Sequence, residues 1–279
     1  MNTPNLFLAG FAKCGTTFLH SILVQHGSVS GYKFKETNMF NIFDEKEEIY
    51  SFAKKFAPKN NNELYLIDST VTYIKNQESL TKIDQLCKRP KFILGIRNIV
   101  DQIISAHAQY DHKFDKQEME NRSKRRMKEC IIKDDYFFSH IKYLVDLFGA
   151  ENIFIYEFTN IKDESKLKIL LEKLQKFLKI EINSNYDRSL LVKNDSKKTR
   201  FKFLSKVLNI GLLNTFIKNV LPFKFVEALQ KIRKNLLEIN KTKNSYELNI
   251  DEELKLKLDS LYKKELEKIK SIELLKFYI

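Results

Sequence analysis

The feature that most constrains the fold is the stretch LFLAGFAKCGTTFLHSIL, at residues 6–23. A short apolar run at 6–9 leads into a loop with two glycines, and apolar residues at helical spacing follow. Three further short apolar runs, at 64–67, 92–96 and 153–156, also alternate with longer helical segments. Short apolar strands that alternate with helices predict a parallel sheet covered by helices on both faces.

The loop carries glycines five residues apart, at Gly10 and Gly15, and Thr16 and Thr17 follow. Nucleotide-binding P-loops read G-x-x-x-x-G-K-[ST] between a strand and a helix. Here Thr16 occupies the lysine position, and Lys13 lies three residues earlier, inside the loop. Backbone N–H groups in such a loop, together with the helix N-terminus, favour an anion. A lysine inside the loop suits one phosphate carrying a transferable group better than it suits a triphosphate.

The segment GIRNIVDQIISAHAQY supports the same interpretation from another part of the chain. Arg97 stands at the predicted C-terminal end of the third strand, and Ser105 follows eight residues later on the next predicted helix. Open α/β sheets bind ligands at the C-terminal ends of their strands. Arginine can pair with phosphate through two charge-assisted hydrogen bonds, so this segment predicts a second phosphate contact.

These two motifs resemble those of the sulfotransferases. The family writes its 5′-phosphosulfate loop K-x-G-T-[TS] and its 3′-phosphate site R-[DN]-P-x-x-[RD]-x-x-S; Ile99 replaces the usual proline. The resemblance implies that 3′-phosphoadenosine 5′-phosphosulfate (PAPS) is the donor, adenosine 3′,5′-bisphosphate is the product, and no metal is required. The implied nucleotide-binding residues are Lys13, Cys14, Gly15, Thr16, Thr17, Arg97 and Ser105.

The segment FKETNMFNIF resembles the K-E-x-x-F-F segment of carbohydrate sulfotransferases, including the heparan sulfate type. In that family the glutamate is the catalytic base, so the resemblance gives this role to Glu36, beside Lys13 as the catalytic cation. Lys35 is then a substrate-binding candidate. Without the other motifs, Lys35 and Glu36 would be an exposed ion pair. The implied acceptor is a hydroxyl or amine, most naturally of a carbohydrate.

The segment IDSTVTYI is similar to the family's [ED]-x-[ST]-P-x-Y, which borders the acceptor, with Val71 in place of proline. It makes Asp68 and Tyr73 substrate-binding candidates. Asp68 could equally orient a turn. A late segment around Lys243 occupies the place of a basic loop that closes over the nucleotide in some members. Cys14 predicts sensitivity to thiol reagents.

The predicted architecture is an α/β, P-loop-like three-layer sandwich with a central parallel sheet and a helical C-terminal cover. One domain spans 1–279, with a nucleotide-binding core over about 1–180 and a helical, basic region over about 181–279. Helices are predicted at 17–25, 74–86, 100–110, 136–148, 162–178 and 252–272, and no strand is predicted after residue 161. Gly149 is a helix C-terminus signal.

The net charge of +13 is uneven, because residues 183–245 hold 14 basic and 4 acidic side chains. This segment could be a solvated face or could bind an anionic partner: a phosphorylated cofactor, an acidic glycan, nucleic acid or an anionic membrane. The three cysteines and five histidines have no metal spacing, and no apolar run is long enough to cross a membrane. A cytoplasmic enzyme that binds no nucleic acid is expected. The rivals are a P-loop kinase or NTPase, and a non-catalytic polyanion-binding protein that uses the basic face.

Overall fold

The computed structural model describes residues 3–25, 27–58, 63–108, 116–182, 197–199, 241–245 and 250–278. The chain divides into two compact units. The first comprises Met1–Gln102, Cys130–Lys193 and Lys257–Ile279, and the second comprises Ile103–Glu129 and Asn194–Leu256. The single domain expected over 1–279 stays a prediction.

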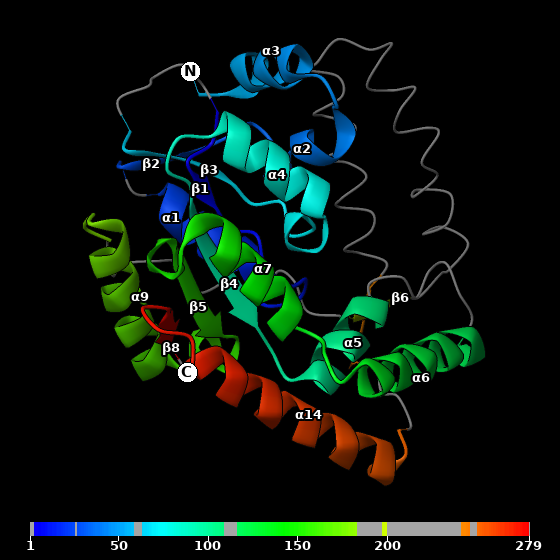
Figure 1. Ribbon diagram of the computed structural model, residues 1–279. Coiled ribbons are helices and arrows are strands. Elements are labelled where there is room, and N and C mark those ends of the chain that lie inside the picture. Colours follow the sequence, from blue (N-terminus) through cyan, green and yellow to red (C-terminus); the bar gives the residue numbers. More distant parts are fainter. Residues whose placement is uncertain are drawn as a thin grey trace. The chain divides into compact units, whose positions relative to one another are not determined.

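A six-stranded sheet, all of it parallel, forms the centre of the first unit, in the order β2-β3-β1-β4-β5-β8 (Figure 1). Its strands are β1 (Leu6–Phe7), β2 (Val29–Gly31), β3 (Tyr65–Asp68), β4 (Lys91–Ile96), β5 (Ile153–Glu157) and β8 (Lys276–Tyr278). The predicted α/β class with a central parallel sheet is confirmed. Strands β1 and β4 are neighbours, so the two segments that follow them emerge at the same edge of the sheet.

Helices cover both faces of this sheet (Figure 1). The helical elements of the first unit are α1 (Thr16–Val24), α2 (Met39–Ile42), α3 (Lys46–Phe56), η1 (Tyr73–Lys75), α4 (Gln77–Leu86), α7 (Phe138–Phe148), η2 (Ala150–Asn152), α8 (Thr159–Lys162) and α9 (Glu164–Leu178). Helix α7 ends at Gly149, as the sequence predicted, and its φ of 81° is a positive value that glycine adopts without strain.

Alternation along the strands sends successive side chains to opposite faces, and this builds two apolar cores. On one face, Leu6 and Ile93 pack in a buried cluster with the apolar sides of α1 and α9. On the other face, the ring of Phe7 stacks on that of Phe92, with centroids 5.1 Å apart. The Phe92 ring also packs on Phe148 of α7, with centroids 4.5 Å apart. Burying each of these large side chains contributes about 2 kcal/mol, which fixes the strand ends that carry the site.

Three helices have residues in both units: α5 (Ile99–Ala108), α6 (Lys116–Lys133) and α14 (Glu252–Lys270). The last helix has an apolar side, since Leu258 and Ile269 are fully buried. The second unit also holds a two-stranded antiparallel sheet of β6 (Lys197–Thr199) and β7 (Lys241–Ser245).

The expectation of no strand after residue 161 is wrong, because β6, β7 and β8 all follow it. Each is three to five residues long, and β8 (KFY) is too short to show a strand pattern in the sequence. Its partner β5 supplies the pairing that defines it. The predicted helical character of 181–279 is therefore correct for α14 only among the described residues, and most of the basic segment 183–245 lies outside them.

Candidate active site

The glycine-bearing loop leaves β1 and runs closely beside β4. A Cβ atom on Gly10 would lie 2.8 Å from the backbone nitrogen of Gly95 and 3.1 Å from the Cα of Leu94. Only glycine allows two backbones to approach this closely. The first glycine of the motif therefore serves the path of the loop, and it places the following residues next to the C-terminal end of β4.

Three consecutive carbonyl groups of the loop, at residues 12–14, are held by side chains from other elements. The hydrogen bonds run from Gln102 Nε2 to Ala12 (2.8 Å), from Arg97 Nη1 to Lys13 (3.2 Å) and from Tyr156 Oη to Cys14 (2.8 Å). In a trans peptide the N–H of the next residue points away from the carbonyl. The N–H groups of residues 13–15 are therefore directed away from these three side chains, as an anion-binding loop requires.

The end of the loop leads directly into the N-terminus of α1. Lys13 and Gly15 both have left-handed backbone conformations, with φ of 67° and 81°. Gly15 is the N-cap of α1, and no side chain of the described residues caps it. The first N–H groups of a helix have no partner within the helix, so this terminus favours an anion. Thr16 is buried in the first turn, whereas Thr17 is exposed beside it.

Arg97 follows β4 directly and is largely buried, with its side chain 16% exposed. Its guanidinium lies 4.6 Å from the ring of Phe158 and 3.9 Å from the Asp101 carboxylate. Burial lowers the pKa of Arg97, while Asp101 opposes that shift. The buried Nε has no hydrogen-bond partner among the described residues. A buried cationic donor without a partner is costly unless a ligand accepts from it, so Arg97 fits an anion here.

Cys14 is fully buried inside the loop, and burial raises the pKa of its thiol to about 12. The nearby Arg97, Lys75 and Lys13 lower this pKa, but burial has the larger effect. Because the thiolate is the reactive form, the expected sensitivity to thiol reagents does not follow. Cys14 instead contributes its backbone to the loop.

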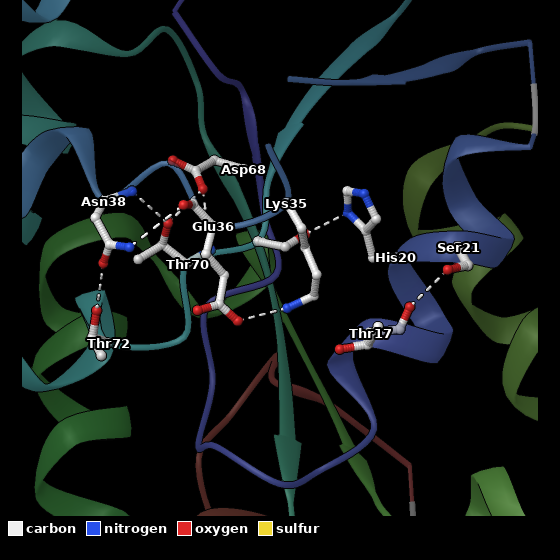
Figure 2. A network of polar contacts seen from close by, with 10 residues as sticks. Thr17, His20, Ser21, Lys35, Glu36, Asn38, Asp68, Thr70 and Thr72 are labelled. Carbon is white, nitrogen blue, oxygen red and sulfur yellow. Dashed lines mark hydrogen bonds and ion pairs between the residues drawn. The ribbon is translucent and has the colours of Figure 1, made fainter. Parts of the chain in front are cut away.

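The Lys35–Glu36 segment lies between β2 and α2. Lys35 Nζ is 2.8 Å from Glu36 Oε1, and the Glu36 side chain is 47% exposed, whereas that of Lys35 is 21% exposed. Figure 2 shows the two side chains pointing toward one another, with their ion pair dashed. The carboxylate is accessible, as a base that must meet an external acceptor has to be.

Asp68 lies behind this segment and is fully buried at the end of β3 (Figure 2). Its two carboxylate oxygens accept from Thr37 Oγ1 (2.6 Å), Tyr73 Oη (3.0 Å), Thr70 Oγ1 (2.7 Å) and the Thr70 backbone N–H (3.1 Å). Burial raises the pKa of Asp68, and the hydrogen bonds from Thr37, Thr70 and Tyr73 oppose the rise. This network ties the segment after Glu36 to the segment after β3.

The network corrects one part of the sequence interpretation. Asp68 and Tyr73 are both 0% exposed, so neither side chain reaches an acceptor in this structure. Of the two roles left open for Asp68, its contacts favour orienting a turn. The backbone agrees, because Ser69 N–H donates to the Lys35 carbonyl (3.2 Å) and Asn38 N–H donates to Thr70 Oγ1 (3.1 Å).

The comparison with known families decides what kind of protein carries this arrangement. The sulfotransferase domain profile matches residues 3–270, nearly the whole chain. The chain belongs to the sulfotransferase family.

Two individual relatives of this sulfotransferase agree with the assignment. A sulfotransferase structure from Alicyclobacillus acidocaldarius aligns with a TM-score of 0.53 and 15% identity, and covers 85% of this chain and 96% of that one. It shows the shared fold. The membrane-associated sulfotransferase kil1 of Dictyostelium discoideum is 29% identical over 106 residues. That match covers 37% of this chain and about a fifth (22%) of the length of kil1.

The remaining nucleotide-binding candidates of the sulfotransferase lie in the second unit. Ser105 is on α5 and is half-buried, and Lys243 is the middle residue of β7. Their assignment to the nucleotide stays a prediction. Within the described ranges, no group of three or more His, Cys, Asp or Glu side chains is placed to hold a metal ion. Likewise, no helix in those ranges is long and apolar enough to cross a membrane.

Sequence reasoning missed several residues that shape the sulfotransferase site. Gln102 and Tyr156 hold loop carbonyls from distant positions, and a carbonyl contact leaves no pattern in a sequence. His20 was also missed; its Nδ1 lies 2.7 Å from Ser69 Oγ. Burial and the nearby Lys35 lower the pKa of His20 to about 4, so the ring is neutral at neutral pH. Its place on α1, three residues beyond Thr17, was the only available signal.

Proposed function

We propose that this sulfotransferase moves a sulfuryl group from PAPS to a carbohydrate hydroxyl or amine, with Glu36 as general base. The main support for the proposal is the loop itself. Side chains bind the carbonyls of residues 12–14, so the N–H groups of residues 13–15 point away from those side chains. The nearby buried Arg97 supplies a second anion-binding group.

The residues present fit a nucleotide with two separate phosphates. The loop and the uncapped start of α1 provide one anion site. Arg97 provides the other, with a buried Nε that lacks a partner among the described residues. Ser105, eight residues beyond it, is the proposed partner of Arg97 at the 3′-phosphate. Lys243 is proposed to approach the same nucleotide from β7.

Lys13 is proposed to neutralise charge at the reacting end of the donor. When bound, PAPS supplies a sulfuryl group attached to a phosphate leaving group. The Lys13 side chain is anchored at the one loop residue whose carbonyl is bound by Arg97, so the two cations share a rigid backbone. Fixed cations at developing negative charge stabilise a transition state without reorganising.

Glu36 is proposed to accept the proton of the acceptor. As the acceptor oxygen or nitrogen bonds to sulfur, the bond from sulfur to the phosphate oxygen breaks, and the acceptor proton passes to Glu36. Lys35, whose Nζ lies 2.8 Å from Glu36 Oε1, is proposed to contact the acceptor as well. Asp68 and Tyr73, which form hydrogen bonds with Thr37, are proposed to hold this segment in position.

The proposal of a carbohydrate acceptor rests on the resemblance of the Glu36 segment to the carbohydrate sulfotransferases. The positive charge of Lys35 would suit an anionic sugar. Transfer from ³⁵S-labelled PAPS to neutral polysaccharides, anionic polysaccharides and a simple phenol tests the proposal. The expected result is label in a polysaccharide that is lost in Glu36→Gln. Label in the phenol alone would overturn the carbohydrate assignment. A cytoplasmic location stays a prediction, and the Dictyostelium relative is described as membrane-associated.

A further inference from the structure

Helix α14 carries three polar residues on one side that reach the neighbourhood of the donor loop. Asp259, Tyr262 and Glu265 are three residues apart, so they lie along one face of the helix. Asn98 Nδ2 donates to Asp259 Oδ1 at 2.8 Å, and Tyr262 Oη donates to Glu157 Oε1 at 2.8 Å. Asn98 follows the end of β4 by two residues, and Glu157 is the last residue of β5.

The third residue of this face fixes the helix against α7. Glu265 is fully buried, and its Oε1 accepts from the backbone N–H groups of residues 136–138 at 2.6, 2.9 and 3.2 Å. The ring of Phe137 in turn packs on Phe11 of the donor loop, with centroids 4.4 Å apart. A buried carboxylate is costly unless it is hydrogen-bonded in one geometry, so Glu265 specifies how this part of α14 docks.

Asp259 contacts Asn98, the residue immediately before α5. Asn98 Oδ1 accepts from the backbone N–H groups of Val100 (3.1 Å) and Asp101 (3.3 Å), which is an N-cap. Ile99, which stands where the family has proline, is the first residue of the helix. Proline there would preset the first turn. In this chain the Asn98 cap defines the helix start, and Asp259 holds the Asn98 amide in the capping orientation.

In the sequence, Asn98 lies between Arg97 and Gln102, whose side chains both donate hydrogen bonds to the donor loop. Arg97, immediately before it, donates to the Lys13 carbonyl, and Gln102, one turn after it, donates to the Ala12 carbonyl. We propose that Asp259 is a positioning residue for Arg97, acting through Asn98, and so sets the affinity for the 3′-phosphate of the nucleotide. This role rests on the proposed function, since it presumes that Arg97 binds that phosphate.

Calorimetric titration with adenosine 3′,5′-bisphosphate tests this role. Asp259→Ala removes the acceptor for Asn98 and should weaken binding between about three- and tenfold, the size of one hydrogen bond. Asp259→Asn keeps an acceptor oxygen and should bind within about twofold of wild type. Both variants remove a negative charge, which by electrostatics alone would strengthen binding of an anion. Weaker binding in Asp259→Ala but not in Asp259→Asn would therefore indicate positioning and not a charge effect.

Two further variants make the result specific. Glu267→Ala removes an exposed carboxylate from the same helix and should leave binding unchanged. In an Arg97→Ala background, Asp259→Ala should add less than about twofold, because the residue it positions is absent. Thermal unfolding of each variant shows that it is folded.

Each outcome decides the question. If wild type binds the bisphosphate, Arg97→Ala weakens binding and Asp259→Ala does not, the positioning role is wrong and the proposed function stands. Equal weakening by Asp259→Ala with and without Arg97 also overturns the role. If wild type does not prefer the bisphosphate over ATP, the proposed donor site fails, and the role of Asp259 fails with it.

Discussion

The donor loop and the base segment of this sulfotransferase are held in opposite ways. The donor loop, residues 10–15, is held through its backbone, because Arg97 after β4, Gln102 of α5 and Tyr156 of β5 bind its carbonyls. The base segment, residues 35–38, is held largely by side-chain hydroxyls and a backbone amide that converge on the segment after β3. The first arrangement leaves N–H groups for an anion, and the second leaves a carboxylate facing solvent.

This difference means that the two halves of the proposed reaction can be damaged separately. Changes in the base segment should reduce transfer and spare nucleotide binding. Changes at Arg97 should first weaken nucleotide binding, because Arg97 donates a hydrogen bond to the donor loop.

The largest expected effect comes from Glu36→Gln, which keeps the shape of the side chain and removes the proton acceptor. We expect the transfer rate to fall by about 10²–10⁴-fold, the usual contribution of a general base. The affinity for adenosine 3′,5′-bisphosphate should stay within about twofold. The transfer assay with labelled PAPS measures the first quantity, and calorimetry measures the second.

Glu48→Gln is the matched control, since Glu48 is an exposed glutamate on α3. It should leave both quantities unchanged. A Glu36→Gln enzyme with full transfer activity would show that the base is another residue.

Asp68→Ala should give the next largest effect, and on stability rather than on binding. It leaves the hydroxyls of Thr37, Thr70 and Tyr73 without their shared acceptor in a buried site. The expected loss is about 3 kcal/mol in the free energy of unfolding, measured by urea denaturation. Bisphosphate affinity of the folded variant should be nearly unchanged. A loss of binding as large as that of Arg97→Ala would show that the two regions are not independent.

The sequence predicts the donor side better than the base side, for a physical reason. Glycine spacing and a strand-end arginine are imposed by backbone geometry, so Gly10, Gly15 and Arg97 could be found without a structure. The burial of Asp68 and Tyr73 depends on pairing between segments more than thirty residues apart, such as Thr37 with Asp68. The resemblance of this segment to the family's acceptor-bordering motif suggested that they touch the acceptor, although both side chains are buried.

The same limit explains the missed strand β8. Three residues after a charged helix carry no pattern of their own, and only pairing with β5 makes them a strand. Long-range partners such as Gln102 for Ala12 and Asp259 for Asn98 were hidden for that reason too. What the sequence indicates well is local: short apolar strands, helical spacing, and Gly149 at the end of α7.

His20 gives a smaller, pH-dependent effect on the base side. Burial lowers its pKa from 6.5 to about 4, so as the pH falls the unfolded chain takes up this proton first. The stability due to neutral His20 is complete above about pH 6.5 and is lost as the pH falls toward 4. Between pH 7 and pH 5 we expect about 2 kcal/mol of this loss. His20→Gln should remove that part of the pH dependence, as measured by urea denaturation at both values. Equal pH dependence in both proteins would contradict it.

The smallest expected effect is at Cys14, in the donor loop. Its buried thiol, with the pKa raised to about 12, should not be alkylated by iodoacetamide at neutral pH in the folded protein. Cys87 and Cys130 are buried as well, so mass spectrometry should find all three cysteines unlabelled until urea is added. Rapid labelling of Cys14 alone would show that the loop opens in solution.

The proposed donor site is tested by calorimetric titration of the wild-type chain with adenosine 3′,5′-bisphosphate and, separately, with ATP. The bisphosphate should bind much more tightly than ATP, and Arg97→Ala should reduce its affinity roughly 10- to 100-fold, as expected for a charged hydrogen-bonding pair. Arg125→Ala, which removes an exposed arginine of α6, should have no such effect. Equal affinity for the two nucleotides, or bisphosphate binding indifferent to Arg97, would contradict the proposed donor site.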